Sequence, residues 1–144
     1  MKILSPAFKN NDIIPDKYTK KGDNIPPPLI FDDIPINTKS LAIIVIDKSS
    51  SFITVTHWVI WNIPANIEKL LPKDVIKYPH GRNSFRGKKY LGPCPPFGTH
   101  KYFFKLYALN NTLKLDEGVT RKKLEKEMQG KILAQAKLIG FYKK

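Results

Sequence analysis

Short apolar segments follow one another along this chain, separated by proline, glycine and asparagine. Most of them are rich in valine, isoleucine, threonine and aromatic residues, which favour β-strands. Residues 41–46 are apolar without alternation, which is typical of a central strand covered on both faces. The pattern therefore predicts a mainly β fold.

Residues 55–63 alternate as a strand does. Because successive side chains of a strand point to opposite faces, one face is predicted to hold Val55, His57, Val59, Trp61 and Ile63. Residues 101–109 alternate in the same way, and the alternation extends back to His100. We therefore expect His100 and Tyr102 on the face directed to the core.

One short helix is expected near the C-terminal end. Thr120 can cap its start, Leu124 and Met128 lie four residues apart on one side, and Gly130 can end it. Residues 134–142 alternate as a last strand. Several strands, long proline-rich connections and little helix predict an antiparallel β-sandwich.

The size of the chain fits a single domain over residues 1–144. Its longest apolar run is far shorter than the ~20 residues that a membrane-spanning helix needs, and no signal peptide is recognisable. Cys94 is the single cysteine, so no internal disulfide can form, which agrees with a reducing compartment. We therefore expect a soluble cytoplasmic protein.

Basic residues dominate the charge, which is +13 at pH 7. Groups such as Lys20-Lys21 and Arg121-Lys122-Lys123 are spread along the chain, which indicates a solvated surface rather than one polyanion-binding face. The chain lacks an aromatic-basic motif of the RNA-binding kind, so we expect no specific nucleic-acid partner. Nonspecific, salt-sensitive binding to nucleic acid stays an alternative.

Polar residues that can bind a ligand or take part in a reaction lie at the expected strand ends. Residues 92–98 contain three prolines and two glycines, so this loop is stiff, and it leads directly to His100. Asp47 follows the apolar run 41–46, and His57 lies on another strand-like segment. An aspartate and two histidines beside a rigid loop predict a small polar site.

These segments also carry a resemblance that extends over almost the whole chain. The matching motifs, in order, are Leu4-Ser5-Pro6-Ala7-Phe8, Ile14-Pro15 with Tyr18-Thr19, Asn24 with Pro27-Pro28-Leu29, Thr38-Lys39-Ser40-Leu41-Ala42, His57-Trp58-Val59 with Asn62-Ile63-Pro64, Gly92-Pro93-Cys94-Pro95-Pro96, His100 with Tyr102, Leu106-Tyr107-Ala108-Leu109, and Met128-Gln129-Gly130 with Ile132-Leu133-Ala134. The chain resembles the phosphatidylethanolamine-binding protein family, which includes the Raf kinase inhibitor proteins, and in particular its short bacterial and archaeal branch.

The resemblance implies a β-sandwich of Greek-key type with one short C-terminal helix. It also implies a shallow pocket for a phosphate, a carboxylate or a phosphoethanolamine-like headgroup, lined by Asp47, His57, Pro93, Cys94, Pro95, Pro96, His100 and Tyr102. Relatives imply binding and regulatory roles without catalysis or a cofactor: lipid-headgroup binding, modulation of kinase pathways and inhibition of serine proteases. A kinase or a serine protease is the protein partner that these roles imply, and small relatives often form homodimers.

Each candidate residue has a structural alternative. A histidine on a strand can be a hydrogen-bonded packing residue, and Asp47 can be a turn-forming acid where its strand ends. Cys94 can be a small filler of the loop. His80, between Tyr78-Pro79 and a glycine, is interpreted as an exposed turn residue.

The chain departs from the family pattern at two places. Where relatives carry an Asp-Pro-Asp-Ala-Pro type motif, this chain has Asp47-Lys48-Ser49-Ser50-Ser51, which lacks the second acid and both prolines. That loop is expected to be looser and less acidic, so phosphate-like ligands should bind at least as well as in relatives. Lys131 stands where the family usually has a histidine, and no role of that histidine is carried over.

Catalysis and metal binding are the remaining alternatives. Asp47, Ser49 and His57 supply the residue types of a hydrolytic triad, but the sequence contains no Gly-x-Ser-x-Gly nucleophile elbow. Asp47, His57, Cys94 and His100 can bind a metal in principle, yet no local pair has zinc-type spacing. We expect neither an enzyme nor a metal site.

Overall fold

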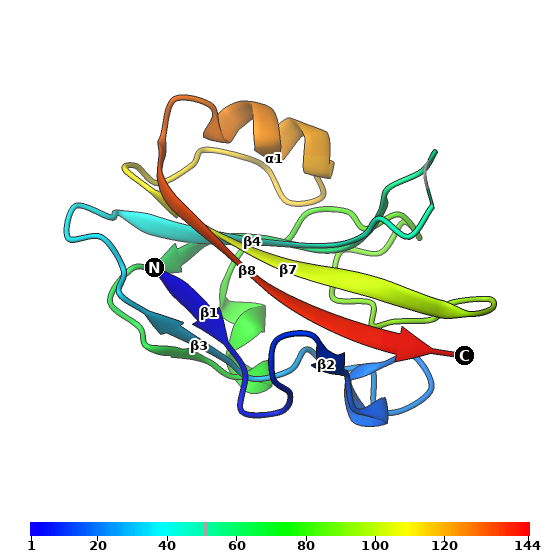
Figure 1. Ribbon diagram of the computed structural model, residues 1–144. Coiled ribbons are helices and arrows are strands. Elements are labelled where there is room, and N and C mark those ends of the chain that lie inside the picture. Colours follow the sequence, from blue (N-terminus) through cyan, green and yellow to red (C-terminus); the bar gives the residue numbers. More distant parts are fainter. Residues whose placement is uncertain (51) are drawn as a thin grey trace.

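Two β-sheets packed against each other make up most of the fold (Figure 1). They are seen in a computed structural model that describes residues 1–50 and 52–144. The smaller sheet has the antiparallel order β1 (Lys2–Leu4), β3 (Leu29–Asp32) and β6 (Lys69–Leu70). The larger sheet has the order β2 (Asp12–Ile13), β8 (Ile132–Lys143), β7 (Thr99–Leu109), β4 (Ser40–Asp47) and β5 (Val55–Pro64).

The predicted fold class, a β-sandwich with one short helix near the C-terminus, is confirmed. The pairs of the larger sheet are antiparallel except β2 with β8, which run parallel over two residue pairs. The chain leaves β5 through β6 and returns as β7 on the other side of β4. β4 is therefore central and buried throughout, as its unbroken apolar run predicts.

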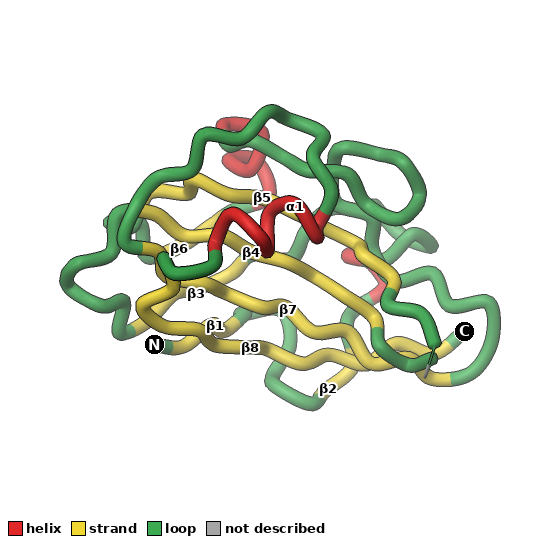
Figure 2. The backbone as a smooth tube through the Cα atoms, turned by 90° about the horizontal axis from the view of Figure 1, so that it is seen from above, coloured by secondary structure: helices red, strands yellow, loops and turns green. Residues whose placement is uncertain are grey.

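Each face of the larger sheet covers a separate apolar cluster. Between the two sheets, Leu41, Ile43 and Val45 of β4 pack with Leu29 and Phe31 of β3. The other face packs against the helix α1 (Arg121–Met128), which lies over the larger sheet in Figure 2. This second cluster holds Ala42, Ile44, Ile46, Val59, Trp61, Tyr107, Leu109, Leu113, Leu124 and Met128.

The helix begins and ends as predicted. The Thr120 side chain accepts a hydrogen bond from the Lys123 amide at 3.2 Å, and Leu124 and Met128 are the buried residues of α1. The long connections contain two 3-10 helices that the sequence did not suggest, η1 (Asp16–Tyr18) and η2 (Pro72–Lys77). No helix within residues 1–50 and 52–144 combines the length and apolar character that crossing a bilayer takes.

Strand β5 does not keep the predicted alternation, because its register against β4 shifts twice. Val45 pairs with Trp58 and Ile46 with Thr56, so His57 is an extra, bulged residue between them. An extra residue in a strand changes the face of the sheet to which the following side chains point. The prediction that the odd-numbered residues of 55–63 share one face is therefore wrong. Val59 and Trp61 pack under α1. Ile63 instead packs between the sheets, together with Trp58 and Ile60.

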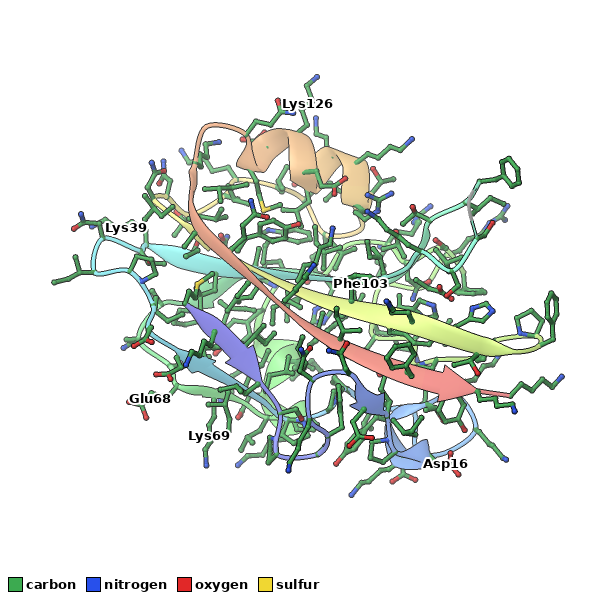
Figure 3. All side chains as sticks on the ribbon, viewed as in Figure 1. Asp16, Lys39, Glu68, Lys69, Phe103 and Lys126 are labelled. Atoms are coloured by element: carbon green, nitrogen blue, oxygen red, sulfur yellow. The ribbon has the colours of Figure 1, made fainter. Side chains whose placement is uncertain are left out.

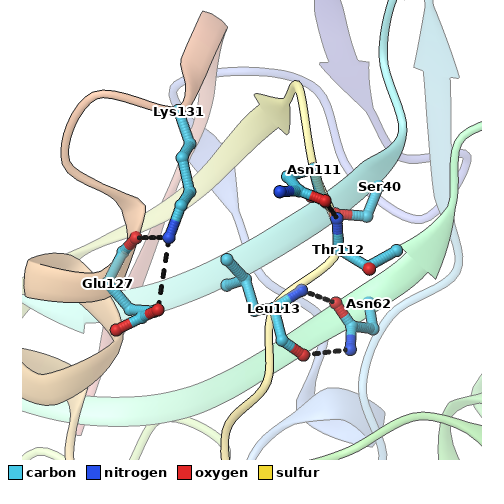
Figure 4. Close-up of polar contacts among 7 residues, drawn as sticks. All are labelled: Ser40, Asn62, Asn111, Thr112, Leu113, Glu127 and Lys131. Atoms are coloured by element: carbon cyan, nitrogen blue, oxygen red, sulfur yellow. Dashed lines mark hydrogen bonds and ion pairs between the residues drawn. The ribbon is translucent and has the colours of Figure 1, made fainter.

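The second irregularity of β5 lies at Asn62, whose backbone has a φ of 54°. This left-handed conformation is uncommon outside glycine, and asparagine is one of the residues that tolerate it. The Asn62 amide nitrogen donates to the Leu113 carbonyl, and its oxygen accepts from the Leu113 amide, both at 2.8 Å (Figure 4). The bulge thus fixes the segment that leads into α1.

Candidate functional site

A small cavity lies where β4 ends, β7 begins, and β5 meets the loop of residues 92–98. It measures about 80 Å³ and is lined by Asp47, Val55, His57, Phe85, Cys94, Pro95, Pro96, His100 and Tyr102. The structure thus brings together the predicted site residues with the exception of Pro93. Pro93 belongs to the same loop but does not line the cavity: its carbonyl accepts a hydrogen bond from the Lys20 amide at 3.1 Å, and the residue lines a neighbouring hollow.

The antiparallel pairing of β4 with β7 places the acid beside the histidine. Asp47 pairs with Tyr102, and His100 lies two residues before Tyr102 on the same face. The Nδ1 atom of His100 is 2.5 Å from Oδ2 of Asp47. The bond occupies Nδ1, so Nε2 is the ring nitrogen of His100 that is free for a ligand.

Asp47 is held as a carboxylate. Burial alone acts to raise its pKa, but hydrogen bonds from Ser49 and His100 outweigh burial, and the net effect lowers the pKa below its usual value of 3.8. The Ser49 amide donates to Oδ1 at 2.7 Å. One oxygen of Asp47 therefore closes a turn, as its structural alternative predicts, and the other orients the His100 ring.

His57 reaches the cavity through the bulge in β5 and is 2% exposed. Its Nδ1 lies 2.7 Å from the Leu91 carbonyl, which can only accept, so the proton is on Nδ1, and Nε2 has no hydrogen-bond partner in the part of the chain that the structure describes. Burial lowers the pKa of His57 below 6.5, although the Leu91 carbonyl and Asp47 act against this. His57 is therefore neutral at pH 7.

Tyr102 supplies a third polar group. It is 1% exposed, and its ring meets the His57 ring edge-on, with centroids 5.2 Å apart. Its hydroxyl lies beside the Cys94 backbone but makes no hydrogen bond of ordinary geometry within the described part of the chain. Burial, and after it Asp47, raises the pKa of Tyr102, so the hydroxyl keeps its proton and can donate. A buried hydroxyl without a partner is costly unless something binds to it.

The proline loop, residues 92–98, is held in place by the connection that contains η1. The Gly92 amide donates to the Asn24 side chain at 2.7 Å, and the Tyr90 hydroxyl donates to the Tyr18 carbonyl at 2.6 Å. The Leu91 amide donates to the His57 carbonyl at 3.0 Å. These bonds hold the loop against β5 and so fix the distance between His57 and the prolines.

Phe85 lines the cavity and was not predicted. Its ring centroid is 5.9 Å from that of His57, although the side chain is 53% exposed. The Asn83 side chain holds its segment in place by accepting from the amides of Phe85 and Gly87. The Asn83 to Gly87 stretch has the composition of a turn, but no sequence signal tells which distant strand such a turn contacts.

The two departures from the family pattern have structural explanations. The Ser49 hydroxyl accepts from the Lys101 amide at 3.0 Å, which ties the start of its loop to β7; Ser51 lies outside the described residues. The Lys131 ammonium donates to the Glu127 carbonyl at 2.9 Å and to its carboxylate at 3.2 Å (Figure 4). Lys131 therefore stabilises the C-terminal end of α1 and is not part of the cavity.

The prediction that His80 is an exposed turn residue is wrong. It is 8% exposed, pairs with Ile60 in an isolated bridge, and its Nδ1 is 2.9 Å from the Tyr78 carbonyl. The turn packs against the edge of β5, which buries the ring. His80 lies outside the cavity and is a useful reference for the two histidines within it.

The site can offer two free imidazole nitrogens and one hydroxyl to a small ligand. Within the described residues, the Ser49 hydroxyl is bonded to the Lys101 amide and to neither histidine. The triad of Asp47, His57 and Ser49 is therefore not assembled. No group of three or more His, Cys, Asp or Glu side chains in the described ranges is arranged to hold a metal ion.

Comparison with known proteins identifies the family and the fold of this chain. The family model described as phosphatidylethanolamine-binding protein matches residues 4–143. A UPF0098 protein of Pyrococcus horikoshii is 45% identical, covering 98% of this chain and 76% of its own length. One from Methanothermobacter thermautotrophicus is 41% identical, covering 100% and 99%.

Solved structures have the same fold. A phosphatidylethanolamine-binding protein homolog from Chlamydia trachomatis superposes with a TM-score of 0.93 at 36% identity, covering 99% of this chain and 97% of its own. YbcL of E. coli, described as a new member of the mammalian PEBP family, gives a TM-score of 0.90 at 26% identity, with coverage of 99% and 98%.

Proposed function

Because this chain belongs to the phosphatidylethanolamine-binding protein family, we propose that its cavity binds a small anionic group of the phosphate or carboxylate type. The protein acts as a binding or regulatory protein and does not convert that group. One observation carries the proposal: His57, His100 and Tyr102 converge on one cavity, and each has a polar atom with no hydrogen-bond partner among residues 1–50 and 52–144.

The size and charge of the cavity define the class of ligand. A space of about 80 Å³ holds a phosphate or carboxylate group with its donors, but it is far below the ~300–1,000 Å³ of pockets that enclose drug-sized ligands. Tyr102 donates from its hydroxyl, and each imidazole donates from Nε2 when protonated. A larger ligand such as phosphoethanolamine is bound by its phosphate end, because both Asp47 oxygens are already engaged.

Isothermal calorimetry at low salt tests the proposal. Inorganic phosphate is expected to bind with one-to-one stoichiometry, and phosphoethanolamine is expected to compete for the same site. The His80→Gln variant is the matched control, because it loses an imidazole outside the cavity. Absence of phosphate binding, or equal loss of binding in His80→Gln and His57→Gln, would refute the proposal.

The affinity for an anion is expected to rise as the pH falls below 6.5 towards about 4. His57 is neutral at pH 7 because burial lowers its pKa below 6.5, and its protonation adds a positive donor beside the ligand. Asp47 remains ionised through this range, since its pKa is lowered from 3.8. Sulfate is the right ligand for this measurement because its charge does not change between these pH values.

The pH dependence should be reduced in His57→Gln, which cannot take up the proton. An affinity for sulfate that is the same at pH 4 and pH 7 in the unmodified protein would contradict the proposed role of His57. A pH dependence that persists unchanged in His57→Gln would assign it to another group.

The absence of catalysis is part of the proposal and has its own support. The pair of His100 and Asp47 resembles the base of a hydrolase, but such a base needs a hydroxyl nucleophile in hydrogen-bond contact. In the described ranges, no serine or threonine hydroxyl is bonded to His100 or His57. We expect no turnover of ester substrates above background.

Inhibition of a serine protease is a second candidate function, favoured by one residue. Phe97 lies at the tip of the proline loop and is 77% exposed. A stiff loop that presents an aromatic side chain loses little freedom on binding, which suits insertion into the specificity pocket of a chymotrypsin-like or subtilisin-like enzyme. The partner would contact the loop next to the cavity.

Protease assays with the purified protein test this second candidate. Inhibition of chymotrypsin is expected, and Phe97→Ala should weaken it at least about tenfold if the side chain fills the specificity pocket. Phe52→Ala is the matched control, because Phe52 is also a strongly exposed phenylalanine. Equal inhibition by the Phe97→Ala variant and the unmodified protein would reject this candidate.

The reducing cytoplasm is the compartment that we propose. Cys94 is a free cysteine, and burial raises its pKa, so it is held as a thiol. A thiol beside the ligand cavity is best preserved where glutathione and thioredoxin keep cysteines reduced.

A further inference from the structure

A basic groove lies on the opposite face of the larger sheet from the His57 and His100 cavity. It measures about 410 Å³ and is lined by Lys48, Phe103, Lys105, Gln135, Ala136 and Lys137. Figure 3 labels Phe103 on this part of the sheet. Phe103 packs against the apolar cluster under α1, whereas Tyr102 and Phe104, its neighbours in sequence, belong to the cluster between the sheets. The groove is therefore separate from the proposed anion cavity.

Like charges lie directly opposite each other in this groove. Lys105 of β7 pairs with Lys137 of β8 in the antiparallel register, and such a like-charge pair destabilises a sheet. Lys48 is a third ammonium on the groove wall. The nearby carboxylate of Glu125 is bonded to Arg121 at 2.8 Å, so it is already partly neutralised.

The state of Lys105 agrees with an excess of positive charge. Burial lowers the pKa of Lys105 first, and Lys48 lowers it next, while Glu125 acts in the opposite direction. A negatively charged ligand in the groove would relieve this repulsion. The groove therefore has the charge that complements a chain of phosphates.

Phe103 gives the groove a second feature that a bare cluster of lysines lacks. Its ring is half-buried, with the Lys101 ammonium 5.9 Å and the Lys137 ammonium 5.8 Å from its centroid. On β7, Lys101, Phe103 and Lys105 share one face, and alternate residues of a strand are about 7 Å apart. The face thus presents cation, aromatic ring and cation in a row.

We propose that this groove binds a single strand of nucleic acid, with a base stacked on Phe103 and the adjacent phosphates contacting Lys48, Lys105 and Lys137. Single-strand sites combine a positive groove with aromatic side chains in this way, and stacking tolerates any base sequence. A duplex hides the faces of its bases inside the helix, so it can use the lysines but not the ring of Phe103. The proposal agrees with the lack of a sequence-specific RNA-binding motif.

Fluorescence anisotropy with labelled oligonucleotides, about 12 nucleotides long, tests the proposal in separate arms for oligo(U) RNA and oligo(dT) DNA. Both share phosphates and stackable bases, and both are expected to bind. Lys105→Gln/Lys137→Gln should reduce affinity at least about tenfold and lower the slope of log affinity against log salt by about 1.4, which corresponds to two phosphate contacts. Phe103→Leu, which keeps an apolar side chain but cannot stack, should reduce affinity at least about fivefold.

The matched control is Lys69→Gln/Lys73→Gln, which removes the same charge from the smaller sheet and η2; Lys69 is labelled in Figure 3. This control should change affinity less than about twofold. An equal loss in both double variants would show that net charge alone attracts the strand, and would overturn the proposal. So would an unchanged affinity in Phe103→Leu, tighter binding of a duplex of the same length, or binding of only one of the two nucleic acids.

Thermal unfolding separates loss of a site from loss of the fold. Because Lys105 and Lys137 repel each other, removing both ammonium groups should raise the Tm of the free protein by about 1–3 °C. Weaker binding by a variant that is more stable then reports the groove itself. A fall in Tm would show that Lys105 and Lys137 do not destabilise the free protein by repulsion. Because the proposal depends on that repulsion, this result would overturn it.

Discussion

Replacing His100 with alanine is expected to weaken phosphate binding by about 10- to 100-fold, the range for a hydrogen bond to a charged group. The substitution has two effects. It removes Nε2, which donates to the anion when the ring is protonated, and it leaves Oδ2 of Asp47, at present 2.5 Å from Nδ1 of His100, facing the anion without that partner. Calorimetry against phosphate measures the loss.

A second substitution separates these two effects. In the His100→Ala background, Asp47→Asn should restore part of the affinity, because it removes the negative charge that repels the ligand. If Asp47→Asn instead weakens binding further, the carboxylate contacts the ligand directly and does not act by orienting His100. His80→Ala, which removes the third histidine, should leave phosphate binding within about twofold of the unmodified protein.

Replacing Gly92 with alanine is expected to destabilise the protein by about 3 kcal/mol or more. A β-carbon at this position would overlap the Tyr18 carbonyl oxygen and would lie 2.7 Å from the Thr19 α-carbon and 3.0 Å from the Asn24 side-chain oxygen. Two of these atoms belong to the backbone, so the loop has to move as a whole. The displaced loop would carry Pro95 and Pro96 away from His57, and phosphate binding should be lost as well.

The matched control for Gly92→Ala lies on the same loop. Gly98 has a φ of 72°, and a β-carbon added there would meet no atom of the described residues within 4 Å, so Gly98→Ala should cost only about 1 kcal/mol through its backbone conformation. Urea unfolding measures both variants. Similar stabilities for the two would show that contact with the η1 connection does not hold the proline loop in place.

The sequence predicts which residues form the site better than it predicts the conformation of β5, the strand that carries His57. Alternation places His100 and Tyr102 on the face directed to the core, because β7 is regular at that end. The same rule fails for β5, where His57 is bulged. A bulge depends on pairing with a neighbouring strand, and period-two counting within one segment does not detect it.

The contacts that hold the loops around the cavity are the second feature that the sequence does not predict. The proline content of residues 92–98 indicates rigidity, but the bonds from Asn24 and Tyr18 that hold the loop come from a connection about 70 residues earlier in the chain. Phe85 reaches the cavity in the same way. These contacts follow from tertiary packing, whereas Asp47, His57 and His100 were found because polar residues at strand ends are unusual enough to notice.

The spatial distribution of the positive charge likewise depends on how the strands pair, and the sequence alone does not show it. In the sequence, the lysines of β7 and β8 are separated by some thirty positions and read as a dispersed solvated surface. The antiparallel pairing brings Lys105 and Lys137 directly opposite each other, beside Phe103. The concentration of charge that we assign to nucleic-acid binding is therefore a property of the sheet.

Nuclear magnetic resonance of the ring nitrogens of the three histidines, recorded during a phosphate titration, tests the central claim most directly. If His57 and His100 hold the anion together, their Nε2 resonances will shift along one saturating curve with a shared dissociation constant, while those of His80 stay in place. Shifts that are confined to one of the two cavity histidines, or that appear equally at His80, would contradict the account.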